Sequence, residues 1–92
     1  MRLEGELDLG TVPMLVDALD DLLEGDPLTI ELDMSQLTFI DSSGVGAYVT
    51  AFRRARAKGS RLTLGDRSGP VQRVFELSGV EDALSRESAE GA

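Results

Sequence analysis

Residues 39–46, with the sequence FIDSSGVG, carry the side chains best suited to chemistry. An aspartate precedes two serines, and two glycines separated by one valine follow them. The apolar residues before the aspartate indicate a strand, and the residues after the serines have helical spacing. Two hydroxyls at such a junction suit four roles: an active-site nucleophile, a phosphate-binding loop, a helix cap and a phosphorylation site.

The catalytic and nucleotide-binding motifs that contain serine or glycine do not fit this segment. A nucleophile elbow requires G-x-S-x-G, but position 41 is Asp. A serine triad requires a general base, and the chain has no His. A dinucleotide fingerprint requires a third glycine where Val49 stands, and the G-K-S/T of a Walker loop is absent. We therefore predict a protein that is not an enzyme.

The sequence contains no pattern typical of a metal or cofactor site. It has no Cys, which excludes thiolate ligands and disulfides. Asp8, Asp33 and Asp41 are carboxylates that could gather around a divalent cation, but their spacing matches no metal-binding motif. We predict neither a metal nor a cofactor.

Two roles for the serines remain open from local physical chemistry. Ser42 or Ser43 can cap the following helix, which is worth about 1 kcal/mol. Gly44 and Gly46 each cost the helix about 1 kcal/mol relative to Ala, and small residues let a partner approach closely. A helix N-terminus also favours an anion, so a phosphate on one exposed hydroxyl would be tolerated. Capping and regulatory phosphorylation are both compatible with the segment.

The elements around this segment follow from hydrophobic periodicity. Alternation predicts strands at 2–8, 28–33 and 61–65, and a polar break separates the second strand from the apolar residues 37–40. Helical spacing predicts one helix after Thr11 as N-cap, a second after the serines and a third over 69–79. The chain from residue 81 is short of apolar residues and is expected to fray.

This alternation of strands and helices predicts an α/β domain with largely parallel strands. Because the strands alternate instead of being apolar throughout, one face of the sheet should be covered by helices and the other left open. Leu15, Leu19, Val49 and Phe52 are expected in the core. The length of 92 residues favours a single domain.

Charge and hydropathy restrict the partners and the location. The net charge is −8, with 11 acidic residues and one basic residue in residues 1–41. Such a chain is repelled by nucleic acids and by anionic membranes, so neither is predicted as a direct partner. The apolar runs fall short of the roughly 20 residues of a membrane span, and the N-terminus is not a signal peptide. We expect a cytoplasmic protein.

Three segments give the chain a family resemblance: GELD before the first helix, LDMSQLTFIDSSGVGAYV in the middle and GPVQRVFELSGV near the end. Over residues 3–80 the chain resembles the STAS domain of bacterial anti-sigma factor antagonists. The resemblance implies a mixed β-sheet with helices mainly on one face. It also implies binding to an anti-sigma factor that is a serine kinase, and thereby regulation of sigma-factor-dependent transcription. In the family, phosphorylation of the serine after the aspartate ends binding, and a serine phosphatase reverses it.

By motif position, the resemblance makes Ser42 the phosphorylation site and places Asp8 at the partner surface beside it. The predicted partner-binding residues are Asp8, Asp41, Ser43, Gly44, Val45 and Gly46. An alternative is a STAS-like structural subunit of a larger transport or signalling complex, in which the serine is only a cap. A small-ligand domain is a further alternative, for which the sequence shows no signature.

The chain departs from the family at both ends. The family usually has a further strand before GELD and a longer terminal helix than SRESAEGA provides. We therefore expect a single STAS-like domain over 1–92 that lacks the first strand and part of the last helix. An edge strand left unpaired in this way would offer a route to a homodimer.

Overall fold

The computed structural model describes residues 1–90, with side chains to residue 87. Strands and helices alternate along the first part of the chain, and two helices end it. The elements are β1 (Arg2–Leu7), α1 (Val12–Leu23), β2 (Thr29–Ile40), α2 (Ser42–Ala57), β3 (Arg61–Arg67), α3 (Gly69–Ser78) and α4 (Val80–Glu90). The predicted α/β class and its strand–helix alternation are confirmed.

The three strands form one sheet in the order β1-β2-β3, and both pairings are parallel. Each connection between successive strands contains a helix, which returns the chain to the same end of the sheet. The sheet of the described residues is therefore parallel throughout, whereas the resemblance implied a mixed one. β1 pairs with the second half of β2, where Leu7 lies opposite Ile40, and β3 pairs with the first half, where Thr29 lies opposite Arg61.

β2 is one continuous strand, so the predicted polar break is wrong. Register shifts in both pairings lie where the break was expected, and Ser35 N–H donates to Asp33 Oδ1 at 2.9 Å. Irregular pairing of this kind absorbs an extra residue without ending a strand. Met34, in the middle of the segment, is fully buried.

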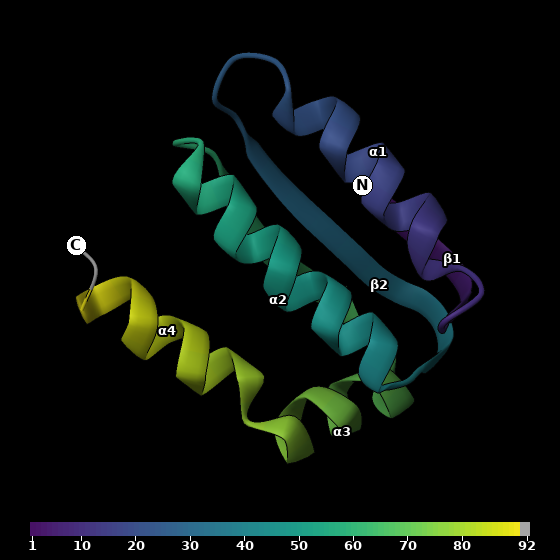
Figure 1. Cartoon of the computed structure of the whole chain (residues 1–92). Coiled ribbons are helices and arrows are strands. Elements are labelled where there is room, and N and C mark those ends of the chain that lie inside the picture. The colour runs from purple at the N-terminus through teal and green to yellow at the C-terminus, as the bar shows by residue number, and fades with distance from the viewer. Residues whose placement is uncertain (91–92) are drawn as a thin grey trace.

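One face of the sheet is covered and the other is open, as predicted. β2 buries Ile30, Leu32 and Leu37, while Thr29 and Glu31, on either side of Ile30, are exposed. Figure 1 shows α1 and α2 side by side in front of β2, with α4 along the other flank of α2. The core lies between these helices and the covered face of the sheet.

The core residues of α1 are those predicted, whereas those of α2 differ. Leu15 and Leu19 of α1 are buried as expected. Val49 and Phe52 of α2 are only partly buried and pack at the margin of the core. The centre of the α2 contact is formed by Tyr48, Ala51 and Ala55, because small alanines let α2 approach its neighbours more closely than larger side chains would.

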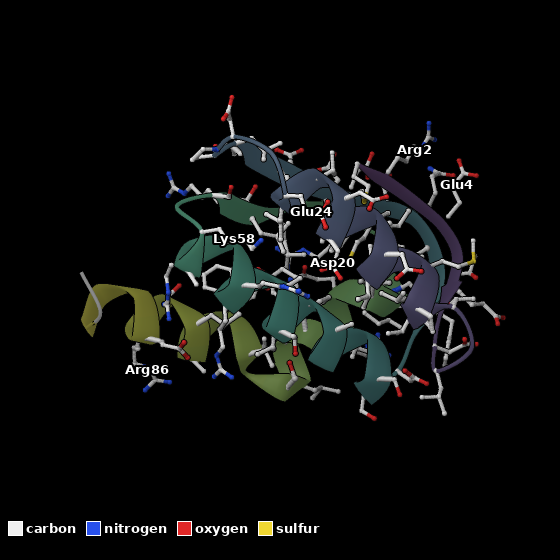
Figure 2. The ribbon with its side chains drawn as sticks, turned by 45° about the horizontal axis from the view of Figure 1, so that its top comes forward. Arg2, Glu4, Asp20, Glu24, Lys58 and Arg86 are labelled. Atoms are coloured by element: carbon white, nitrogen blue, oxygen red, sulfur yellow. The ribbon has the colours of Figure 1, made fainter. Side chains whose placement is uncertain are left out.

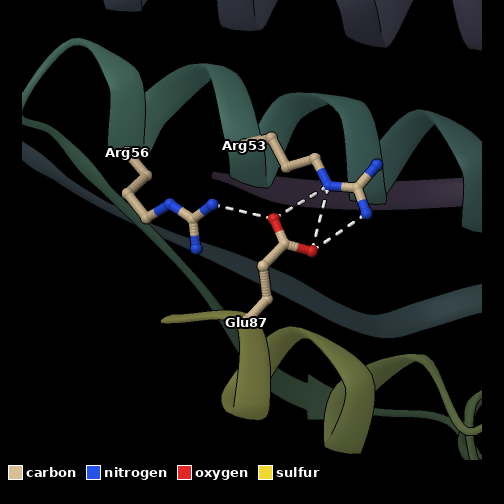
Figure 3. A network of polar contacts seen from close by, with 3 residues as sticks. All are labelled: Arg53, Arg56 and Glu87. Carbon is tan, nitrogen blue, oxygen red and sulfur yellow. Dashed lines mark hydrogen bonds and ion pairs between the residues drawn. The ribbon is translucent and has the colours of Figure 1, made fainter. Parts of the chain in front are cut away.

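The expected fraying from residue 81 is wrong for the described part of that segment, which forms α4. Leu84 is buried in the core, and Glu87 binds both Arg53 and Arg56 of α2, as Figure 3 shows. Residues 91 and 92 lie outside the described residues. No helix within residues 1–90 is both long and apolar enough to cross a lipid bilayer.

Candidate functional site

The junction of β2 and α2 is capped by Asp41. Its backbone is extended, and its Oδ1 accepts a hydrogen bond from Gly44 N–H at 3.1 Å. The carboxylate thereby satisfies one of the N–H groups that a helix leaves unpaired at its start. Capping by Ser42 or Ser43 is therefore not what this structure uses, because the preceding aspartate already occupies the N-cap position.

Ser42 is the first residue of α2 and is exposed. Within the described residues, no hydrogen bond involves the hydroxyl of Ser42 or that of Ser43. The Ser42 hydroxyl is thus open to solvent at the positive end of a 16-residue helix. A hydroxyl in this position can be modified or contacted without disturbing a cap.

Asp8 and Asp41 follow neighbouring strand ends. Leu7 and Ile40 are paired across β1 and β2, and Asp41 N–H donates to Leu7 O at 3.3 Å. The carboxyl ends of parallel strands meet at one edge of a sheet, where α/β proteins commonly bind ligands. The two aspartates that the sequence singled out therefore lie at the same edge, beside the start of α2.

Asp8 also organises the turn into α1. Its Oδ1 accepts hydrogen bonds from Gly10 N–H at 3.0 Å and from Thr11 N–H at 3.1 Å. Thr11 stands at the N-cap position of α1, as predicted, but its side chain does not cap that helix. Its hydroxyl instead donates to Glu6 O at 2.8 Å and accepts from Asp8 N–H at 2.9 Å.

The two glycines of the segment have different environments. A Cβ on Gly44 would lie 2.7 Å from Ile40 Cγ1 and 2.9 Å from Leu7 O, so only glycine lets α2 start this close to the strand ends. A Cβ on Gly46 would meet nothing within 4 Å, and Gly46 is exposed. Gly44 and the buried Val45 support the surface from beneath, whereas Gly46 lies on it.

Two exposed apolar residues lie next to the aspartates, and nothing in the sequence pattern predicted their exposure. Leu9 follows Asp8 and is 76% exposed, and Phe39 precedes Ile40 and is 45% exposed. Phe39 lies opposite Glu6 in the sheet. Strict alternation from the inward Leu37 would have turned Phe39 inward as well. The register shift between Gly5 and Glu6 adds one residue to β2 at this point, so Ile40 is buried and Phe39 is exposed.

The chemistry of this edge is that of a binding surface with an accessible hydroxyl. Glu6, Asp8 and Asp41 make it acidic, while Leu9 and Phe39 make it partly apolar. Among the residues that the structure describes, no group of three Asp, Glu, His or Cys side chains is arranged to hold a metal ion. Exposed apolar residues beside polar ones are typical of protein interfaces.

Comparisons with known proteins agree with this geometry. A family model described as "Mlab, STAS domain" matches residues 1–86. An anti-sigma-B factor antagonist of Listeria monocytogenes is 31% identical over 87 residues, covering 95% of this chain and 76% of the relative. One of Staphylococcus aureus is 26% identical over 84 residues, covering 91% and 78%. The solved structure of the anti-sigma factor antagonist SpoIIAA in its unphosphorylated form superposes with a TM-score of 0.75 at 32% identity, covering 96% of this chain and 85% of that one.

Proposed function

The chain belongs to the STAS domain family, and from that membership we propose that it is an anti-sigma factor antagonist controlled by phosphorylation of Ser42. It binds an anti-sigma factor, which then releases its sigma factor for transcription. The observation that carries the proposal is the Ser42 hydroxyl, exposed at the first residue of α2 while Asp41 supplies the cap. The protein acts in the cytoplasm as a binding partner and not as an enzyme.

The binding surface is the edge formed by the start of α2 and the ends of β1 and β2. Ser42 and Gly46 form its exposed helical part, and Gly46 leaves room for a partner to approach the helix. Leu9 and Phe39 supply apolar contact area on either side of the aspartates. Interfaces gain most of their binding energy from a few such apolar anchors within a polar rim.

Phosphorylation at Ser42 ends binding through electrostatics. The bound anti-sigma factor acts as a serine kinase and transfers the γ-phosphoryl group of ATP to the Ser42 hydroxyl. The phosphate adds about −1.5 to −2 charge at neutral pH. The helix N-terminus accommodates this charge in the free protein, whereas burying it beside Asp41 against a partner costs several kcal/mol without a matching cation. A serine phosphatase restores the binding form.

The comparisons support this proposal at two levels. The relatives from Listeria and Staphylococcus are named anti-sigma-B factor antagonists. The similar SpoIIAA structure is that of an anti-sigma factor antagonist in its unphosphorylated form. The assignment of the switch to Ser42 in this chain rests on its motif position and on its exposure.

The assignment is tested by incubating the wild type, Ser42→Ala and Ser43→Ala with the cognate anti-sigma factor and ATP, followed by intact-mass measurement. We expect one phosphate on the wild type and on Ser43→Ala, and none on Ser42→Ala. Because Ser43 is adjacent and also carries a hydroxyl, it is a matched control for the position. Phosphate on Ser43, or no phosphate on the wild type, would refute the proposed switch.

A second candidate function comes from the matched family model, whose description names Mlab. In that case the chain is a structural subunit of a larger transport or signalling complex, and Ser42 stays unmodified. Affinity purification from the native cell, read by mass spectrometry for partner and phosphosite together, distinguishes the two. A stable complex that lacks both an anti-sigma factor and a phosphoserine would favour this second function.

A further inference from the structure

β1 and β2 are both irregular at the same level, shortly before they end at the candidate site. Gly5 lies opposite Leu37 and Glu6 lies opposite Phe39, so Thr38 is an additional residue of β2 with no partner in β1. Gly5 has a φ of 82°, a conformation that residues other than glycine rarely adopt. An additional residue redirects the side chain that follows it, and such irregularities are frequent beside functional sites.

Two features hold this irregularity in place. The Thr38 hydroxyl donates a hydrogen bond to Gly5 O at 3.1 Å, which joins the additional residue of β2 to the glycine of β1. A Cβ on Gly5 would meet nothing within 4 Å, so glycine is required by the backbone conformation and not by a lack of space. The glycine and the threonine thus act together at one point of the sheet.

The additional residue determines which apolar side chain of β2 stays in water. Leu37 is buried, and strict alternation from it would bury Phe39 and expose Ile40. The observed order is the reverse, because Ile40 is 4% exposed and Phe39 is 45% exposed. The fold therefore leaves the larger apolar side chain uncovered close to Asp41, and the burial of its ring remains available to a partner.

Glu6 adds a charge without an ion-pair partner next to the ring. It lies opposite Phe39 in the parallel pairing and is exposed. No ion pair between described residues involves its carboxylate, whereas that of Glu4 lies 3.7 Å from Arg2, and Figure 2 shows both side chains at the rim of the molecule. The complement of an aromatic ring beside such a carboxylate is an apolar pocket with a basic side chain at its rim.

We propose that Gly5 and Thr38 are positioning residues, which present Phe39 and Glu6 together as one anchor for the anti-sigma factor. The anti-sigma factor receives the ring in an apolar pocket and places a basic side chain opposite Glu6. This inference rests on the proposed function and adds to it a contact on the sheet side of the edge. Gly5 and Thr38 act through the ring that they direct outward.

Burial of position 39 in the complex is tested with a fluorescent reporter, because the chain has no native Trp. In Phe39→Trp the introduced indole should be quenched readily by acrylamide in the free protein. The cognate anti-sigma factor should reduce this quenching and shift the emission to shorter wavelength. Leu22→Trp is the matched control, since Leu22 is 39% exposed near the C-terminal end of α1 and should stay accessible. An indole at position 39 that stays equally accessible in the complex would overturn the proposal.

The positioning role is tested by isothermal titration calorimetry with the anti-sigma factor, on variants whose folding is checked by circular dichroism. Gly5→Ala and Thr38→Val should each weaken binding by roughly threefold or more, and by no more than Phe39→Ala does. Thr38→Val removes the hydrogen bond alone and serves where Gly5→Ala does not fold. Gly25→Ala, the same change in the turn after α1, should bind like the wild type.

A double-mutant cycle separates positioning from general damage to the fold. If Gly5 and Thr38 act through the ring, neither substitution should lower the affinity further once Phe39→Ala is present. In the Phe39→Trp background, each should instead shift the emission of the free protein to shorter wavelength, because the ring position turns inward. Additive losses of affinity with unchanged emission would overturn the positioning role.

The basic side chain of the partner is tested by charge reversal. Glu6→Lys should weaken binding by roughly tenfold at low salt and by less at high salt, because an attraction becomes a repulsion that salt screens. Glu24→Lys makes the same change in net charge at the C-cap of α1 and should leave the affinity unchanged. Equal effects of the two variants would assign the loss to net charge and overturn the contact at Glu6.

The wild type separates this inference from the proposed function. A wild type that neither binds the anti-sigma factor nor gains a phosphate on Ser42 would refute the proposed function, and the inference would fall with it. A wild type that binds and is phosphorylated on Ser42, while Phe39→Ala binds as tightly, would refute this inference alone.

Discussion

At the scale of single residues, Ser42 combines exposure with a position at the start of α2. We predict that Ser42→Asp keeps the fold and lowers the affinity for the anti-sigma factor by roughly a hundredfold or more, because a charge is buried at the interface. Ser42→Ala should bind like the wild type and resist the kinase. Isothermal titration calorimetry measures both. Unchanged affinity in Ser42→Asp would place the interface elsewhere.

Replacing the two glycines of the motif by alanine should have opposite effects on stability. Gly44→Ala should lower the free energy of unfolding by about 1–3 kcal/mol, because its Cβ would collide with Ile40 and Leu7. Gly46→Ala should raise it by about 0.5–1 kcal/mol, since the position is open and Ala favours the helix. Urea denaturation of the two variants is a direct comparison. If both behave alike, the close contact at Gly44 is not as described.

Phe39 and Leu9 should contribute to binding and little to folding. Phe39→Ala and Leu9→Ala should weaken anti-sigma factor binding by about 1 kcal/mol or more, because exposed apolar side chains gain burial only in the complex. Phe75, which is 1% exposed, is the control: Phe75→Ala should cost the fold about 3–5 kcal/mol. Calorimetric binding and thermal unfolding are measured on all three. Wild-type affinity in both surface variants would remove these residues from the interface.

At the scale of elements, α4 is attached to α2 by packing and by charge. The Glu87 carboxylate lies 2.9 Å from Arg53 Nη2 and 2.7 Å from Arg56 Nη2. The hydrogen bond from Arg53, followed by that from Arg56, lowers the pKa of Glu87 below its ordinary value. The same contact raises the pKa of Arg53.

The lowered pKa of Glu87 gives the attachment of α4 a pH dependence. Its stabilising contribution is fully present above the ordinary glutamate pKa of about 4.3 and is lost as pH falls through the lower folded-state value. We expect Glu87→Gln to loosen α4 at neutral pH and to make the acid decline of stability shallower. Hydrogen exchange of the α4 amides from neutral pH to pH 3 tests this. Identical profiles for variant and wild type would show that Leu84 packing alone holds the helix.

At the scale of the whole molecule, Tyr48 lies where the helices meet the core. Its ring packs edge-on against Phe75 with centroids 5.6 Å apart, and lies 6.1 Å from that of Phe52. Burial, with a smaller effect from the charge of Glu81, raises the pKa of Tyr48 to about 12. The neutral phenol is therefore the form compatible with the folded core.

The raised pKa of Tyr48 predicts that the whole domain loses stability at alkaline pH. The folded-state pKa exceeds the unfolded value near 10, so the contribution of Tyr48 is fully present below pH 10 and is lost as pH rises through about 12. Tyr48→Phe should remove this part of the loss of stability at alkaline pH. Unfolding followed by circular dichroism between pH 9 and 12 measures it. An equally steep loss in the variant would assign the transition to other groups.

The sequence by itself determined the elements whose signals are short-range. Apolar residues repeat every two positions in a strand with one buried face and about every 3.6 positions in a helix with one buried face. These two periods predicted all three strands and the first three helices. The same spacing placed Ser42 at the start of a helix and predicted a sheet with one open face. These features depend on residues a few positions apart, which can be recognised without knowing the fold.

The tertiary structure decided the features that depend on contacts between distant segments. Asp41 instead of a serine is the cap because its backbone is extended as it leaves β2. Gly44 and Gly46 look equivalent along the chain, but only Gly44 approaches β1 and β2. α4 has a weak local signal and is held by Leu84 in the core and by ion pairs with α2, more than 30 positions away in sequence. Local patterns specify which element forms, whereas packing between elements determines which of its residues are buried, which are capped and which remain available to a partner.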